Sequence, residues 1–172
     1  VIQSQNVVLT SIGKDHQDLL GYTDHEVLNQ KMYISSNIKN LFVGDINPEL
    51  KNLILNNYPH SKVKYFLSDF INNLNIEMSD LSANQKNYLL ALNTVSLLLE
   101  ININNEVNNL GTIEGRFEIV NQNPLKVLDG AHNLDGIKHF FKDYENQFNY
   151  EKTDVFVGFK KGKDLELSLI HI

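Results

Sequence analysis

Cysteine is absent from this 172-residue chain, and proline occurs only three times. Without cysteine the chain has no disulfide bonds and no thiolate metal ligands, so a reducing compartment is permitted but not established. Basic residues are too few for a nucleic-acid or membrane-surface protein, since the formal net charge is −6. No apolar run reaches the roughly 20 residues that span a bilayer, and the first residues lack a signal-peptide pattern. We therefore expect a cytoplasmic protein that binds neither nucleic acid nor membrane.

Apolar runs alternate with helical patterns in the first part of the chain. Strands are predicted at 6–12, 41–44 and 63–67. Helices are predicted from the T-x-x-E capping box at 23–26 and from Asn-Pro-Glu at 47–49. This alternation predicts a mostly parallel sheet with crossover helices.

The remaining segments carry weaker or longer patterns. Residues 68–82 are expected to form a loop with a possible short strand, and 85–101 a core helix that is buried on most sides. The Asn-rich stretch 102–109 is interpreted as an interdomain linker. A further strand is expected at 154–159, and 165–172 could begin a helix.

A strand, a turn and a helix are predicted between Leu125 and Tyr144. Lys126 to Leu128 have the pattern of the end of a buried strand, Gly130 permits a sharp turn, and Asn133 can cap the following helix. That helix has one apolar face, which consists of Ile137, Phe140, Phe141 and Tyr144.

Asp129 and His132 follow this strand, and ligands of open α/β sheets bind beyond the carboxyl ends of strands. The carboxylate could accept a hydrogen bond from a ribose hydroxyl, and the imidazole could donate to a phosphate or meet a purine ring. The alternative is a capped turn in which backbone N–H groups satisfy a buried Asp129.

Two separated motifs resemble one family when they are taken together. The first is TSIGKDHQDLLG at 10–21 with Lys31 beyond it, and the second is GRFEIV at 115–120 followed by P-x-x-VLDGAHN at 124–133. In this order they resemble folylpolyglutamate synthase, with or without dihydrofolate synthase activity, of the Mur ligase superfamily.

The resemblance implies an α/β fold in two parts. Residues 1–108 would be the C-terminal half of a Mur-ligase-type ATP-binding central domain, and residues 109–172 the first part of a Rossmann-like C-terminal ligase domain. No G-x-x-x-x-G-K-[ST] phosphate loop is present. We therefore expect the N-terminal part and the C-terminal end of the parent protein to be missing, and the fragment itself to be inactive.

The resemblance also assigns roles to individual residues. It implies a magnesium ion on His16 and a carbamylated, catalytic Lys31 that acts together with His16. It places Asn87 on the adenine of ATP, and it places Arg116, Asp129 and His132 on its phosphates and ribose. From the residues alone, His16 fits a solvated turn, Lys31 an exposed lysine and Arg116 a surface ion pair.

The implied activity is that of an ATP-dependent ligase. It would add L-glutamate to a (tetrahydro)folate, with dihydropteroate as a second candidate substrate, through an acyl phosphate. ATP and Mg2+ are the implied cofactors, the other partners are small molecules, and we expect a monomer. Two alternatives stay open, namely a Mur-type ligase of peptidoglycan precursors and a non-catalytic nucleotide-binding remnant.

Overall fold

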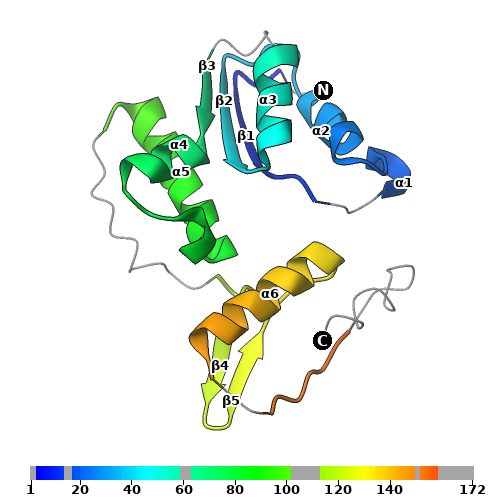
Figure 1. Cartoon of the computed structure of the whole chain (residues 1–172), viewed down its shortest axis with the longest axis vertical. Coiled ribbons are helices and arrows are strands. Elements are labelled where there is room, and N and C mark those ends of the chain that lie inside the picture. The colour runs from blue at the N-terminus through cyan, green and yellow to red at the C-terminus, as the bar shows by residue number, and fades with distance from the viewer. Residues whose placement is uncertain (1–2, 14–16, 59–62, 102–112, 150–151, 159–172) are drawn as a thin grey trace. The chain divides into compact units, whose positions relative to one another are not determined.

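The computed structural model describes residues 3–13, 17–58, 63–101, 113–149 and 152–158 (Figure 1). The chain divides into two compact units, Val1–Asn109 and Leu110–Ile172. Among the described residues, no helix is both long enough and apolar enough to cross a membrane.

The first unit contains a three-stranded parallel sheet in the order β1-β2-β3. Its strands are β1 (Asn6–Ser11), β2 (Asn40–Asp45) and β3 (Val63–Phe66), as the apolar runs predicted. Its helices are α1 (Gln17–Leu20), α2 (Asp24–Met32), α3 (Pro48–Asn57), α4 (Leu67–Asn73), the 3-10 helix η1 (Met78–Asp80) and α5 (Ala83–Leu99).

Side-chain caps fix the starts of the helices that the sequence predicted. Thr23 and Glu26 form a reciprocal capping box at α2, so two otherwise unbonded N–H groups are satisfied there. At α3, Asn47 Oδ1 accepts from Leu50 N at 2.8 Å, and Pro48 occupies the first turn. Both helices therefore begin where the sequence indicated.

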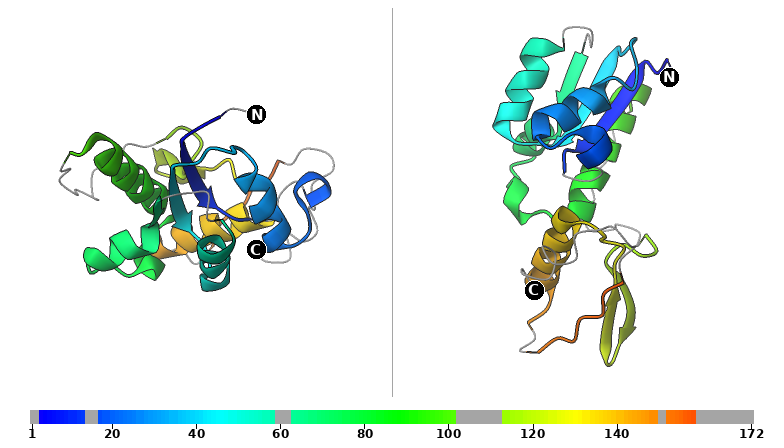
Figure 2. Two further views of the ribbon diagram at one scale, coloured as in Figure 1. Left: turned by 90° about the horizontal axis from the view of Figure 1, so that it is seen from above. Right: turned by 90° about the vertical axis from the view of Figure 1, so that its right-hand side faces the viewer.

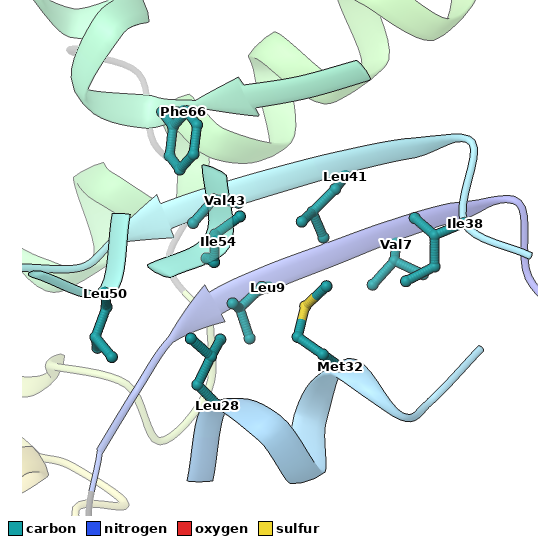
Figure 3. Packing of buried hydrophobic residues seen from close by; sticks show 10 residues of the cluster. All are labelled: Val7, Leu9, Leu28, Met32, Ile38, Leu41, Val43, Leu50, Ile54 and Phe66. Carbon is teal, nitrogen blue, oxygen red and sulfur yellow. The ribbon is translucent and has the colours of Figure 1, made fainter. Parts of the chain in front are cut away.

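Helices lie on both faces of this sheet (Figure 2, left), and apolar side chains pack between them and the strands on each face. Figure 3 shows one layer, in which α2 and α3 pack on β1, β2 and β3 through Val7, Leu9, Leu28, Met32, Ile38, Leu41, Val43, Leu50, Ile54 and Phe66. The other layer joins the sheet to α4 and α5 through Phe42, Leu67, Ile71, Leu81, Leu89 and Leu90. This two-sided cover explains why Leu41, Phe42 and Val43 are all fully buried in succession.

Two predictions for the first unit were wrong in part. The expected loop at 68–82 contains α4 and η1, because Leu67 and Ile71 lie one turn apart and are buried together. The long helix is present as α5, but it is not buried on most sides, since Val95 is 42% exposed and Leu99 is 63% exposed.

The second unit is an antiparallel hairpin of β4 (Glu118–Gln122) and β5 (Leu125–Leu128), followed by α6 (Leu134–Gln147). Asn133 caps α6 as predicted, since its Oδ1 accepts from Gly136 N at 2.8 Å. The expected apolar face of α6 is present, with Ile137 buried and Phe140, Phe141 and Tyr144 half-buried.

The expectation of a buried strand before Gly130 was wrong in part. β5 is a strand, but its residues alternate between half-buried and exposed, and within the described part of the chain it pairs with β4 alone. Residues 152–158 are exposed and form neither helix nor strand, in contrast to the strand expected at 154–159. The predicted helix at 165–172 lies outside the described residues.

Candidate functional site

The carboxyl ends of β1 and β2 meet at Ser11 and Asp45, which are paired in the sheet register. One step earlier, a Cβ on Gly44 would lie 2.0 Å from the carbonyl oxygen of Thr10. The strands therefore approach each other more closely than any side chain permits, and only glycine fits at this position.

Lys31 lies at the end of β1. It is half-buried in the last turn of α2, and its Nζ donates a hydrogen bond to the carbonyl of Ser11 at 3.0 Å. It also lines an open depression of about 450 Å³ with residues 7–10 and 30–34. This contact places Lys31 next to the strand that leads toward His16, while His16 itself lies outside the described residues.

An ion pair that the sequence did not predict fixes the start of α5 at the end of β2. Lys86 Nζ lies 2.7 Å from Asp45 Oδ2, and the lysine side chain is only 13% exposed. Asn87, the predicted adenine contact, is the next residue and is exposed in the second turn of α5. The pair joins residues 41 positions apart, so no local pattern could have revealed it.

The described residues alone do not fit the magnesium ion that the resemblance implies. No group of three or more histidine, aspartate or glutamate side chains gathers among them. Asp45, the carboxylate at the end of β2, is already paired with Lys86. A magnesium site would therefore depend on His16, beyond the part of the chain that the structure describes.

In the second unit the GRFE segment at 115–118 is hydrogen-bonded to the DGAHN segment at 129–133. Gly130 N donates to the carbonyl of Gly115 at 2.8 Å, and Phe117 N donates to Asp129 Oδ2 at 2.8 Å. Ala131 N donates to Asp129 Oδ1 at 2.7 Å. We refer to the turn 113–118 together with the loop 129–132 as the two-loop site.

Asp129 makes the backbone contacts that the capped-turn alternative predicted. Each carboxylate oxygen accepts one backbone N–H, so the side chain holds the two-loop site together. An ionised carboxylate offers about four lone-pair positions, so one further bond per oxygen is compatible with this arrangement.

Arg116 is exposed at the top of the turn, and it is the only arginine of the chain. Its Nη1 lies 3.1 Å from the position that a Cβ on Gly130 would occupy, so the guanidinium extends across that glycine. The backbone of the turn is fixed around it, since Arg116 N donates to Ile113 O and Gly115 N donates to Glu118 Oε2. A guanidinium in such a fixed turn is suited to bidentate phosphate binding.

His132 is exposed, and its Nδ1 lies 3.0 Å from the carbonyl of Gly130. A carbonyl can only accept, so this bond places a proton on Nδ1 and makes Nε2 an acceptor while the ring is neutral. Donation from Nε2 to a phosphate therefore requires the protonated ring, whereas contact with a purine ring does not.

The structure brings together Arg116, Asp129 and His132, and it places Lys31 and Asn87 on α2 and α5 of the first unit. Sequence interpretation missed Lys86 and Asp45. It also missed Phe117, although this residue was part of the GRFE motif.

Comparison with protein-family models gave no match, and neither did comparison with curated proteins. Solved structures of folylpolyglutamate synthase (FPGS) do match. A complex with AMPPCP and folate superposes with a TM-score of 0.65 at 21% identity, over 87% of this chain and 44% of that one. A complex with AMPPCP gives 0.61 at 20% identity, over 86% and 44%. The apo form of the L. casei enzyme gives 0.62 at 20% identity, over 87% and 44%.

These values show that the chain has the mixed α/β fold of the matching part of FPGS, which the motifs had predicted. The chain spans less than half the length of the solved structures that it matches. At this level of identity the likeness concerns the fold.

Proposed function

We propose that these residues form part of an ATP-dependent ligase that joins L-glutamate to a folate. One observation carries the proposal: the GRFE and DGAHN motifs are hydrogen-bonded, through Phe117 and Asp129 among others, into a single site that presents the only arginine of the chain. Fold analogy supports it, because FPGS structures of the same fold hold AMPPCP and folate.

The proposed chemistry runs through an acyl phosphate. A carboxylate oxygen of the folate attacks the γ-phosphorus of ATP, and ADP leaves. The amine nitrogen of L-glutamate then attacks the acyl carbon, the C–O bond to phosphate breaks, and inorganic phosphate and a proton are released. Catalysis of both steps consists mainly of positioning and of neutralising phosphate charge.

In this proposal the two-loop site binds the phosphates and the ribose. Arg116 neutralises phosphate charge, and the remaining lone pairs of Asp129 accept from a ribose hydroxyl. His132 contacts the nucleotide through its ring, and donates to phosphate only when it is protonated.

The first unit would supply Asn87 to the adenine edge and Lys31 to the phosphate side. As a carbamate, Lys31 Nζ would have lost two protons, one to become a neutral amine and one on forming its bond to CO2, so that a cation becomes an anion beside the end of β1. His16 would hold a magnesium ion, whose charge would offset that of the phosphates.

The phosphate role is tested by titrating the 172-residue chain with AMPPCP in a calorimeter. Arg116→Gln should weaken binding at least about tenfold, because a charge-assisted bidentate contact is lost. Lys126→Gln is the matched control, since it removes one exposed positive charge from β5 of the same unit. Equal affinity of the two variants would contradict the role of Arg116.

The ligase reaction is tested by ATP-dependent release of inorganic phosphate, in the 172-residue chain and in the longer protein. Release that requires both folate and L-glutamate is the expected result for the longer protein. Release that instead requires a peptidoglycan precursor and its amino acid would favour the Mur-type alternative. Nucleotide binding without any release would favour a non-catalytic remnant.

A further inference from the structure

Phe117 is a bulky residue held in the left-handed region of backbone conformation, with φ at +47°. Side chains with a Cβ disfavour this region, and an aromatic residue has no local hydrogen bond to offset the cost. Such strain persists only where the surrounding structure imposes it, and it concentrates at binding and catalytic sites.

Two contacts impose this conformation. On the backbone side, Phe117 N donates to Asp129 Oδ2 at 2.8 Å. On the side-chain side, the ring stacks on Phe148 with centroids 6.1 Å apart and planes at 4°, and it meets Phe140 at 5.6 Å and 49°. The residue is therefore fixed at both ends, by the loop after β5 and by aromatic rings of α6 and its C-cap.

The peptide group that donates to Asp129 is the one that joins Arg116 to Phe117. Its orientation sets the direction of the Arg116 Cα–Cβ bond relative to the loop, and the guanidinium extends over Gly130. If Phe117 relaxed to an ordinary conformation, this peptide would rotate and carry Arg116 away from Gly130.

We propose that Phe117 is a positioning residue that holds Arg116 over Gly130, with its ring anchored on Phe148 and its N–H on Asp129. The inference deepens the proposed function, on which its nucleotide-binding consequence rests. The claim that Phe117 holds Arg116 over Gly130 does not depend on the proposed function, because it concerns only contacts within the second unit.

A pair of aromatic truncations on α6 and its cap separates positioning from general packing. Phe148→Ala removes the ring stacked on Phe117, whereas Phe141→Ala removes a ring that meets Phe140 at 5.3 Å. Both variants lose one aromatic side chain, Phe141 from the apolar face of α6 and Phe148 from the C-cap of that helix, and neither alters a residue of the two-loop site. A purely structural role predicts the same behaviour for both.

The geometric readout is the nuclear Overhauser effect between the Arg116 side chain and the α-protons of Gly130, measured on the full 172-residue chain. It should be lost or reduced in Phe148→Ala and retained in Phe141→Ala. Retention in both variants, or equal loss in both, would overturn the proposal. Phe117→Gly is the second variant, since glycine adopts the left-handed region but has no ring to anchor, and it should also lose the effect.

The nucleotide readout is AMPPCP affinity of the same proteins. Phe148→Ala should weaken it by at least about fivefold, and Phe141→Ala by less than about twofold. If the unaltered chain does not bind AMPPCP, the proposed nucleotide site fails, and the nuclear Overhauser effect still decides whether Phe117 positions Arg116. If it binds and Phe148→Ala binds equally well, the positioning proposal is refuted while the nucleotide site stands.

Discussion

Substitution of Gly44 by alanine should separate β1 from β2 at the end where Ser11 and Asp45 lie. The added Cβ would be 2.0 Å from Thr10 O, and ordinary contact begins at 3.4 Å, so the strands would have to move apart by about 1.4 Å. The obstacle is a backbone carbonyl, which cannot rotate away as the end of a flexible side chain can. Leu90 restricts movement on the other side, since its Cδ2 would be 3.1 Å from the same Cβ.

The expected cost is at or above the upper end of the usual range for overpacking, about 3 kcal/mol. For a unit of roughly 100 residues, this should lower the melting temperature by at least about 12 °C. Calorimetric unfolding measures that shift, and amide hydrogen exchange along β1 and β2 shows whether the loss begins at this end of the sheet. Lys31 should also lose its contact, because its acceptor is the Ser11 carbonyl.

Gly158→Ala is the control, because among the described residues no atom beyond those of its chain neighbours lies within 4 Å of the Cβ that it would add. It should leave the melting temperature unchanged within error. A Gly44→Ala chain that melts within about 3 °C of the unaltered protein would refute the close approach of the strands.

Three further predictions concern hydrogen bonds and ion pairs. The pKa of Glu26 is held below its usual value by hydrogen bonds from the backbone and the hydroxyl of Thr23, and to a smaller extent by one from the backbone of Tyr22. The cap of α2 should therefore be intact above about pH 4.5 and weaken as pH falls through the lowered pKa. Hydrogen exchange of the Tyr22 amide should show this dependence, and Glu26→Gln should abolish it. Asp129→Asn should destabilise the second unit by about 1 to 2 kcal/mol in denaturant unfolding. The two oxygens of Asp129 each accept one backbone N–H, and the NH2 group that replaces one of them in asparagine cannot accept. A double-mutant cycle on Asp45 and Lys86 should give a coupling of about 1 kcal/mol or more because the lysine is largely buried, and a value of zero would show that the pair does not anchor α5.

The sequence predicted the starts of α2, α3 and α6 because each start depends on a side chain within the same turn. Thr23, Asn47 and Asn133 each accept from an N–H three residues ahead, so the complete interaction is visible in a four-residue window. The same local logic could have placed the start of α5, since Ser82 and Gln85 form a capping box there.

α4 escaped prediction for the opposite reason. It follows β3 directly, and its N-cap residue, Phe66, makes no side-chain capping bond. The helix is held by Leu67 and Ile71, which are buried against the sheet, so its stability is tertiary. A pattern that depends on packing partners elsewhere in the chain carries no start signal of its own.

The candidate site also contains both local contacts, which the sequence could predict, and contacts between distant segments, which it could not. The turn after β5 and the cap of α6 could be predicted, because both are local. The bond from Phe117 to Asp129 joins two loops, and the Asp45–Lys86 pair joins a strand to a helix. Neither the distance between such groups nor the strain at Phe117 can be read from composition or periodicity.

The bonding of the two-loop site decides which of its groups can bind an anion. Five backbone N–H groups at and beside Arg116 and Gly130 already have acceptors within the chain. They belong to Gly115, Arg116, Phe117, Gly130 and Ala131. A phosphate bound by these N–H groups would have to displace bonds to Asp129 and Glu118 and leave two carboxylates beside an anion. The N–H groups therefore serve to fix the loop, and in the proposed site the phosphate contacts would come from side chains, Arg116 and protonated His132. Substitution of Arg116, the only arginine in the chain, therefore removes the one permanently charged group of the proposed phosphate site and is its most direct test.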